Sequence, residues 1–319
     1  MDGLLIIDKP AGLTSHDVVS RVRRIVHERR VGHTGTLDPF ATGVLIVLVR
    51  RATRLAQFLS GAEKEYYAVV RFGYSTETGD LTGKPTSEIS EGSARISSIN
   101  WSDLEIEAAL QSLRGEIDQI PPMYSAKKRN GRKLYELARR GETVDRQAVR
   151  VNIREFEALR YGGRFLKDNE DGTVDLGVRV VCSAGTYIRT LAEALGERLG
   201  IGAHLAELRR TRAGDFSIAS AVTLDQLRDA VVEESLGTVL LPPDAALLSM
   251  PFVDLTERDA QRVRQGIAIS VSEHSSGAAA QGDNVRMRDE AGTLVAVGCY
   301  DAASKSFQLR VVIPPEEEL

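Results

Sequence analysis

The segment from Gly32 to Leu45 constrains the fold of this chain more than any other part of its sequence. It reads Gly-His-Thr-Gly-Thr-Leu-Asp-Pro-Phe-Ala-Thr-Gly-Val-Leu, and the uncharged run 44–49 predicts a buried strand. Three glycines and a proline indicate a loop with unusual backbone angles or a close approach to something else. Pro39 biases Asp38 toward extended geometry and prevents a helix there. The sequence therefore predicts a carboxylate presented by a stiff loop beside the core; the alternative is that Asp38 only caps a turn.

The composition is that of a globular protein with one large domain and a smaller one, since 42% of the 319 residues are hydrophobic and 27% are charged. No uncharged apolar run reaches the length of a membrane span, and residues 1–8 lack the basic leader of a signal peptide. Cys182 and Cys299 are far apart, and the five histidines form no paired ligand motif. We therefore expect a cytoplasmic protein with no disulfide framework and no metal ion.

The net charge of −4 hides an uneven distribution. Residues 1–215 hold 33 Lys and Arg against 29 Asp and Glu, whereas residues 216–319 hold 8 against 16. Within the first part the basic residues form four clusters, at 21–30, 50–54, 127–140 and 209–212. One such cluster is usually a solvated face, but four of them in a mildly acidic chain indicate a surface for a polyanion.

Hydrophobic periodicity predicts helices and strands in irregular alternation. The expected strands are residues 4–7, 44–49, 66–72, 149–159 and 174–182. The expected helices are residues 15–28, 53–59, 101–113, 134–140 and 186–199, and residues 75–98 are expected to form a loop. Neighbouring strands that look hairpin-linked favour an α+β fold with a mixed sheet over a doubly wound parallel sheet. After a boundary near residues 241–251, short strands predict a small β-barrel.

A second informative segment runs from Cys182 to Leu191. It follows a predicted strand, turns at Gly185 and opens a helix. Turns of this kind often hold anionic groups at the helix N-terminus. Tyr187 and Arg189 lie in the first turn of that helix, although an isolated Arg189 would more often be a surface residue.

Six motifs in order along the chain resemble the TruB-type tRNA pseudouridine synthases. They are Asp8–Gly12, Gly32–Leu45, the strand that opens at Tyr66, Tyr124–Ala126, Ser183–Arg189 and the run from Gly202 to Arg210. The resemblance covers the chain from its start to about residue 215. The last 70 residues match less well and share only the general character of the family's C-terminal barrel.

The resemblance implies an α+β pseudouridine synthase fold, with a mixed and largely antiparallel sheet flanked by helices. It places the catalytic domain in residues 1–248, with a basic RNA-clamping insertion at about 124–150, and a PUA-like β-barrel in residues 249–319. It implies isomerisation of uridine 55 to pseudouridine in the T-loop of tRNA. Such a reaction needs no redox step, and we expect no cofactor, no metal and no obligate protein partner for a monomer acting on the T-arm.

The resemblance also assigns the catalytic residues. Asp38 matches the nucleophile, and Arg189 matches a partner that keeps the carboxylate ionised and oriented through a bidentate pair. Tyr66 matches the tyrosine that stacks on the flipped base. Tyr187 and Leu208 are expected to line the same pocket. Whether Asp38 attacks C1′ or C6, or only assists departure of the base, is left open by the sequence.

Further residues are assigned to the RNA and to the loop. His33 resembles the histidine that fills the space left by flipped nucleotides, and Arg54 resembles a basic position that faces the substrate. Lys9 and Pro10 are expected to support the active-site loop. The basic insertion is expected to contact phosphates and so to supply affinity more than specificity, through Lys127, Lys128 and Arg129.

Three other functions are consistent with parts of the sequence. One is a relative that modifies another RNA, like the guide-dependent box H/ACA catalysts. Another is a non-catalytic factor that binds and folds tRNA. A hydrolase of glycosidic bonds is the weakest alternative, because that chemistry usually needs two carboxylates and these motifs contain one clear candidate, Asp38.

Overall fold

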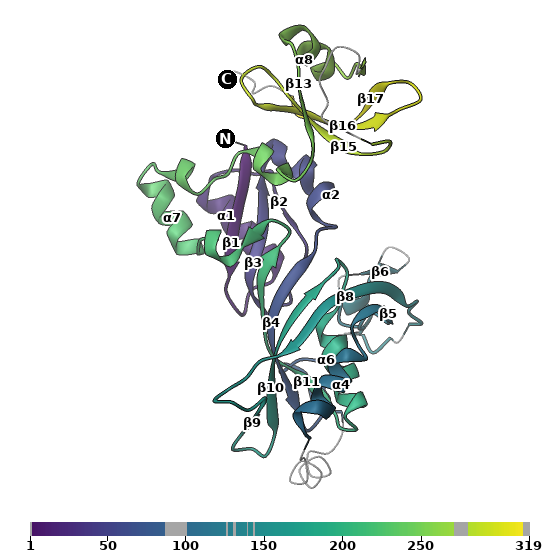
Figure 1. Ribbon diagram of the computed structural model, residues 1–319. Coiled ribbons are helices and arrows are strands. Elements are labelled where there is room, and N and C mark those ends of the chain that lie inside the picture. Colours follow the sequence, from purple (N-terminus) through teal and green to yellow (C-terminus); the bar gives the residue numbers. More distant parts are fainter. Residues whose placement is uncertain are drawn as a thin grey trace.

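The computed structural model describes residues 2–86, 101–270 and 280–314, except residues 126, 130, 131, 139 and 143. The chain forms a ten-stranded sheet, a five-stranded sheet near the C-terminus and a two-stranded hairpin. Most neighbouring strands are antiparallel, but β3 (Thr42–Val49) and β11 (Ala203–Ala213) pair in parallel. Helices flank this mixed sheet (Figure 1). The α+β class and the largely antiparallel sheet are thus confirmed.

The large sheet has the strand order β1-β3-β11-β4-β10-β8-β5, and β2, β9 and β12 pair beside this path. Its remaining strands are β1 (Gly3–Lys9), β2 (Val31–Thr34), β4 (Lys64–Phe72), β5 (Gly115–Gln119), β8 (Val149–Ala158), β9 (Leu166–Asp168), β10 (Val174–Cys182) and β12 (Phe216–Ser217). The helices near it are α1 (Ser15–Ile25), α2 (Ala56–Leu59), α4 (Asp103–Gln111), α6 (Ile188–Arg198) and α7 (Leu224–Val232). Short 3-10 helices lie at Arg50–Leu55, Ile218–Ser220, Leu236–Thr238 and Pro243–Leu247.

Helix α1 shows how local sequence sets an element. Thr14 and Asp17 form a reciprocal capping box at its start, which satisfies two backbone N–H groups. Its apolar stripe packs on β1 and β3 in a shared core cluster. The helix ends at Ile25, before the predicted residue 28, because His27 adopts a left-handed conformation with φ of 51° that stops it.

A second core lies under the other half of the sheet. One face of β4, β8, β10 and β11 packs there against α4 and α6, and Leu191 and Leu195 of α6 are fully buried. The strand β11 was not predicted, because four charged residues interrupt its apolar pattern. It nevertheless joins the two halves of the sheet by pairing with β3 on one side and β4 on the other.

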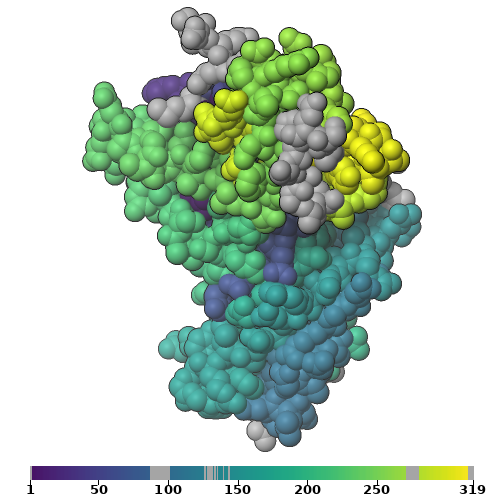
Figure 2. Space-filling model, turned by 45° about the horizontal axis from the view of Figure 1, so that its top comes forward, coloured from purple at the N-terminus to yellow at the C-terminus, as the bar shows by residue number. Residues whose placement is uncertain are grey.

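The C-terminal residues form a five-stranded sheet in the order β13-β15-β16-β17-β14, covered by helix α8 (Glu257–Arg264). The strands are β13 (Phe252–Asp254), β14 (Ile269–Ser270), β15 (Asn284–Arg288), β16 (Leu294–Asp301) and β17 (Ser306–Val312). Val297 and Val311 of this sheet share a core cluster with Ile46 of β3, so the two sheets pack on each other. The space-filling view places these green-to-yellow residues at one end of the molecule and the blue-to-teal residues at the other (Figure 2).

The basic insertion forms the hairpin β6 (Lys128–Arg129) and β7 (Arg132–Lys133), followed by α5 (Leu134–Ala138). Across the described ranges, no helix combines the length and the apolar character that a membrane span requires.

Candidate active site

Asp38 lies in the loop between β2 and β3, and this loop is held from several sides. Gly35 takes a φ of +84° at the start of the turn. The Ser15 hydroxyl accepts a hydrogen bond from the Leu37 N–H at 2.9 Å. The Lys9 ammonium, whose side chain is fully buried, donates to the carbonyl oxygens of Pro10, Leu13 and Pro39 at 2.8, 2.7 and 3.2 Å. The backbone around Asp38 is therefore fixed before any substrate arrives.

Arg189 meets the Asp38 carboxylate with two donors. Its Nε lies 2.9 Å from Oδ2 of Asp38, and its Nη2 donates to Oδ1 at 3.1 Å. The same guanidinium donates to the carbonyls of Thr78 and Tyr124 at 2.7 and 2.8 Å. The Arg189 side chain is 5% exposed and that of Asp38 is 31% exposed, so the arginine lies behind the carboxylate. Burial raises the pKa of Asp38, and the Arg189 guanidinium opposes this rise.

Asp80 is a site residue that the sequence did not reveal. Its Oδ2 lies 3.6 Å from Nη1 of Arg189, so the guanidinium stands between two carboxylates. Oδ1 of Asp80 accepts hydrogen bonds from the Thr78 hydroxyl and from both the N–H and the hydroxyl of Thr82, at 2.8, 2.9 and 2.6 Å. The signal was present as Thr-Gly-Asp-Leu-Thr, an Asp able to bond its neighbours in a turn, within a segment that was expected to be only a loop.

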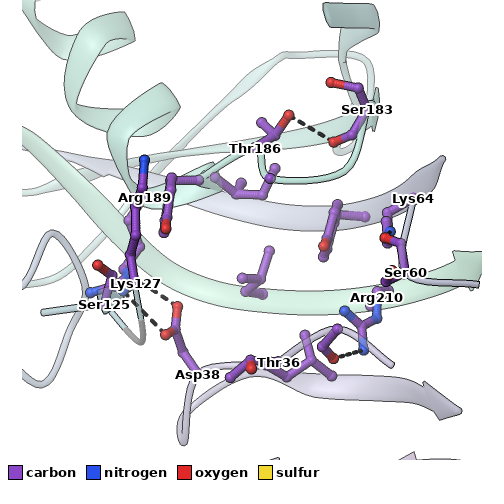
Figure 3. Close-up of a pocket in the computed structure, with 17 residues that line it drawn as sticks. Thr36, Asp38, Ser60, Lys64, Ser125, Lys127, Ser183, Thr186, Arg189 and Arg210 are labelled. Atoms are coloured by element: carbon purple, nitrogen blue, oxygen red, sulfur yellow. Dashed lines mark hydrogen bonds and ion pairs between the residues drawn. The ribbon is translucent and has the colours of Figure 1, made fainter. Parts of the chain in front are cut away.

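A cavity of about 270 Å³ opens beside this pair. Tyr66 on β4 and Leu208 on β11 form part of its wall, and both are nearly buried, with exposed fractions of 8% and 6%. Burial raises the pKa of the Tyr66 hydroxyl, which therefore stays protonated. The cavity is also lined by Gly35, Thr36, Leu37, Asp38, Ser60, Lys64, Ser125, Lys127, Ser183, Gly185, Thr186, Tyr187, Ile188, Arg189 and Arg210 (Figure 3).

Tyr187, the residue before the start of α6, also lines this cavity. Its N–H donates to Oε1 of Gln119 on β5 at 3.0 Å, and its carbonyl accepts from Nε2 of the same side chain at 3.3 Å. Burial raises the pKa of the Tyr187 hydroxyl. Six of the residues selected from the sequence therefore line one cavity, namely Asp38, Tyr66, Lys127, Tyr187, Arg189 and Leu208.

Two further selected residues lie outside the cavity lining. His33 is half-buried on β2, and burial, together with the Arg210 charge, lowers its pKa, so its imidazole is neutral at pH 7. Arg54 donates to the carbonyl of Val312 on β17 at 2.8 Å, which places it at the contact with the C-terminal sheet. Their roles toward RNA stay predictions.

The basic insertion borders the cavity through Lys127, whose side chain is exposed. Lys128 and Arg129 form strand β6, but their side chains lie outside the described part of the structure. In the residues that are described, no group of three or more His, Cys, Asp or Glu side chains is arranged to hold a metal ion.

Comparison with known protein families places the chain. A family model described as the N-terminal domain of TruB family pseudouridylate synthase matches residues 23–188, which is more than half of the chain. The chain belongs to the TruB family of pseudouridylate synthases. A second model, the C-terminal domain of tRNA pseudouridylate synthase B, matches residues 189–248 of this TruB-family chain. The resemblance seen in the six motifs is confirmed.

Individual relatives agree with this assignment. The tRNA pseudouridine synthase B of Solibacter usitatus is 42% identical over 298 residues, which are 93% of this chain and 95% of the relative. The protein of the same name from Mycobacterium sp. strain KMS is 46% identical over 268 residues, 84% of each chain. Among solved structures, a chain of a Cbf5-Nop10-Gar1 complex has 28% identity and a TM-score of 0.73, covering 99% of this TruB-family chain and 86% of that chain. The pseudouridine synthase fold is thereby confirmed.

Proposed function

We propose that this chain converts uridine 55 in the T-loop of tRNA to pseudouridine, with Asp38 as the nucleophile and without a cofactor. The observation that carries the proposal is that Asp38 and Arg189, joined by two hydrogen bonds, line the same cavity as Tyr66. The family membership supports the reaction class. The relatives named tRNA pseudouridine synthase B, at 42% and 46% identity, support tRNA as the substrate.

The chemistry asks for one ionised carboxylate that is oriented toward a flipped nucleotide. The bond between C1′ and N1 of uridine breaks, the base rotates, C5 bonds to C1′, the proton on C5 is lost and N1 gains a proton. Because Arg189 fixes both oxygens of Asp38 from behind, the carboxylate needs little reorganisation when it meets the ribose or the base. The same pair supports attack at C1′, attack at C6 or assisted departure of the base.

The target base has to leave the stack of the T-loop to reach Asp38. Unstacking and unpairing a base costs a few kcal/mol in enzymes that flip their target nucleotide. The Tyr66 ring offers a stacking surface inside the cavity, and Leu208 offers an apolar wall beside it. Lys127 at the cavity edge, with the insertion around it, supplies cations for the phosphates of the T-arm.

We further propose that the chain acts as a cytoplasmic monomer that needs no guide RNA and no protein partner. The structural neighbours include an H/ACA RNP bound to a substrate RNA, at 26% identity and a TM-score of 0.72, so the fold alone does not separate the two modes. The higher identity to the synthase B relatives favours the stand-alone mode.

A bare tRNA transcript incubated with the purified chain alone tests the proposal. We expect pseudouridine at position 55, and none in a matched transcript with cytidine at that position. The Asp38→Asn variant, which keeps the shape of the side chain, is expected to bind the transcript and leave it unmodified. Pseudouridine that forms only after a guide RNA or a second protein is added would contradict the stand-alone mode. Binding without modification by the native chain would favour the tRNA-folding factor.

A further inference from the structure

Two buried cations line the cavity at the end away from Asp38. Lys64 on β4 and Arg210 on β11 have exposed fractions of 6% and 1%, and both belong to the cavity lining. Figure 3 shows them with Ser60 at one end of the cavity, while Asp38 and Arg189 lie at the other. The reaction as derived above uses only the Asp38 end.

Neither cation has an anionic partner among the residues that the structure describes. Lys64 donates to the carbonyls of Ser60 and Ala62 at 2.7 and 2.5 Å, and Arg210 donates to the carbonyls of Val44 and Gly35 at 2.7 and 3.1 Å. Within the described ranges, no carboxylate of the chain lies within 4.0 Å of either group. Burial, and after it the nearby Arg210 charge, lower the pKa of Lys64 to about 8. Two like charges at a desolvated site are costly unless an anion joins them.

On the opposite face of the same sheet, three neighbouring arginines are paired with carboxylates. Arg179 on β10 lies 2.7 Å from Glu65, and Arg212 on β11 lies 2.8 Å from Glu63. Arg209, next to Arg210 in sequence, lies 2.7 Å from Asp8. Arginines on neighbouring positions of the sheet therefore have carboxylates, and the cavity-facing Arg210 does not. Lys9 is also buried against carbonyls alone, but it lies outside the cavity lining and its three acceptors use its donors, whereas Lys64 and Arg210 line the cavity, where a ligand can reach them.

The position of the two cations relative to Tyr66 indicates which ligand. Arg210 stands directly opposite Tyr66 in the pairing of β11 with β4, and Lys64 is two residues before Tyr66 on the same face of β4. Burial raises the pKa of the Tyr66 hydroxyl, and the nearby Arg210 charge opposes this rise. A base that stacks on the Tyr66 ring therefore presents its edge to the cations.

Bond cleavage creates an anion in that base. When the C1′–N1 bond breaks, its electron pair stays on N1, and the charge is shared by N1, O2 and O4 of the detached uracil. The charge is neutralised when C5 bonds to the electrophilic C1′, and the later loss of the C5 proton is balanced by protonation of N1. A backbone phosphate is a poorer occupant, because the RNA strand continues on both sides of it. That strand would have to enter a cavity of about 270 Å³ to reach groups that are at least 94% buried.

We propose that Lys64 and Arg210 form a charge-stabilising site for the detached uracil, so that they hold the leaving base while it rotates. The inference rests on the proposed pseudouridine synthase function and deepens it. Since the negative charge exists only after cleavage begins, the two residues stabilise the transition state and add little to the binding of intact RNA.

Charge-neutral replacement of Lys64 tests this site. Lys64→Gln keeps a donor for the Ser60 and Ala62 carbonyls but removes the charge, and Lys64→Arg keeps both. Removal of one preorganised donor of this kind typically costs about 100-fold in rate. We expect Lys64→Gln to lower the single-turnover rate on T-arm RNA by about that factor with an unchanged Kd. Lys64→Arg is expected to restore most of the rate, and Lys167→Gln on the exposed strand β9 is the matched control.

A better leaving group sharpens the test. With 5-fluorouridine at the target position, the fluorine already withdraws charge from the ring, so Lys64→Gln should lose much less rate than it does with uridine. Because 5-fluorouridine has no C5 proton to lose, both rates are measured as the disappearance of the starting nucleoside, by chromatography after digestion. Equal losses of rate on the two substrates would overturn the proposal, and so would a native rate in the folded variant. A native rate with a raised Kd would indicate a phosphate site instead. If Lys64→Gln does not fold, Arg210→Gln carries the same comparison. An inactive native chain would instead refute the synthase function itself.

Discussion

Replacement of Arg189 by lysine tests the pair that orients Asp38. Arg189 uses Nε and Nη2 for the two oxygens of Asp38, at 2.9 and 3.1 Å, and also donates to the Thr78 and Tyr124 carbonyls. A lysine ammonium keeps the charge but is a single point, so it cannot hold both carboxylate oxygens and both carbonyls at once. The Arg189→Lys variant should therefore leave Asp38 charged but poorly oriented.

The magnitude follows from the hydrogen bonds lost. One hydrogen bond to a charged group is worth about 1.5–3 kcal/mol, and about 1.4 kcal/mol is tenfold in rate. Loss of one of the two bonds to Asp38 should thus slow the single-turnover reaction roughly 10- to 150-fold. Because the Arg189 side chain is only 5% exposed, the carbonyls left unpaired should also lower the free energy of unfolding, by about 1–3 kcal/mol.

The assay measures single-turnover formation of pseudouridine on T-arm RNA, with the Kd for that RNA and urea unfolding measured on the same preparations. Arg198→Lys, at the exposed end of the same helix α6, is the matched control and should be native in all three. A folded Arg189→Lys variant with a rate within twofold of the native chain would refute the reasoning that the bidentate pair orients the nucleophile.

Four other perturbations have expected outcomes. Lys9→Met should lower the free energy of unfolding by about 2 kcal/mol, because three loop carbonyls lose their donor. An unchanged urea midpoint would show that the loop is stable without Lys9. Gly43→Ala should lower the free energy of unfolding by more than about 2 kcal/mol, since its Cβ would lie 2.2 Å from the Arg210 carbonyl oxygen. Gly12→Ala, also at positive φ but in open space, should lower it by less. Because burial raises the pKa of Asp38, which acts ionised, the rate should fall with decreasing pH at a midpoint above 3.8; a lower midpoint would contradict this. Joint replacement of Lys127, Lys128 and Arg129 by glutamine should reduce the slope of log affinity for tRNA against log salt concentration by about two to three. An unchanged slope would show that these residues make no phosphate contacts.

The sequence predicted the helices and strands whose caps and apolar patterns lie within the element itself. The helix that begins after Thr14 has its cap and apolar stripe within twelve residues, and residues 44–49 of the strand Thr42–Val49 are an unbroken apolar run. The strand Ala203–Ala213 was missed because its charged residues face outward or into the cavity, where their partners come from distant strands. Periodicity within one segment contains no information about such partners.

The site was predictable only as far as the family resemblance reached. Asp38 and Arg189 are 151 residues apart, and no spacing rule joins them; the resemblance brought them together, and the structure places their side chains in contact. Asp80 lay in a segment without apolar periodicity, so its contact with Arg189 became visible only in three dimensions. Lys64 had no signal, and Arg210 was assigned only to a basic cluster expected at the surface, whereas it is buried; a buried cation without a carboxylate is recognised only from what surrounds it.

The central claim is that Asp38 carries out the isomerisation of a T-loop uridine, and release of tritium tests it most directly. T-arm RNA labelled with tritium at C5 of uridine is incubated with the native chain and with Asp38→Ala, and binding of the same RNA is measured for both. We predict stoichiometric release by the native chain and none by Asp38→Ala, at similar Kd. Release by Asp38→Ala at the native rate would contradict the role of this carboxylate, and the absence of release by a native chain that binds the RNA would contradict the reaction.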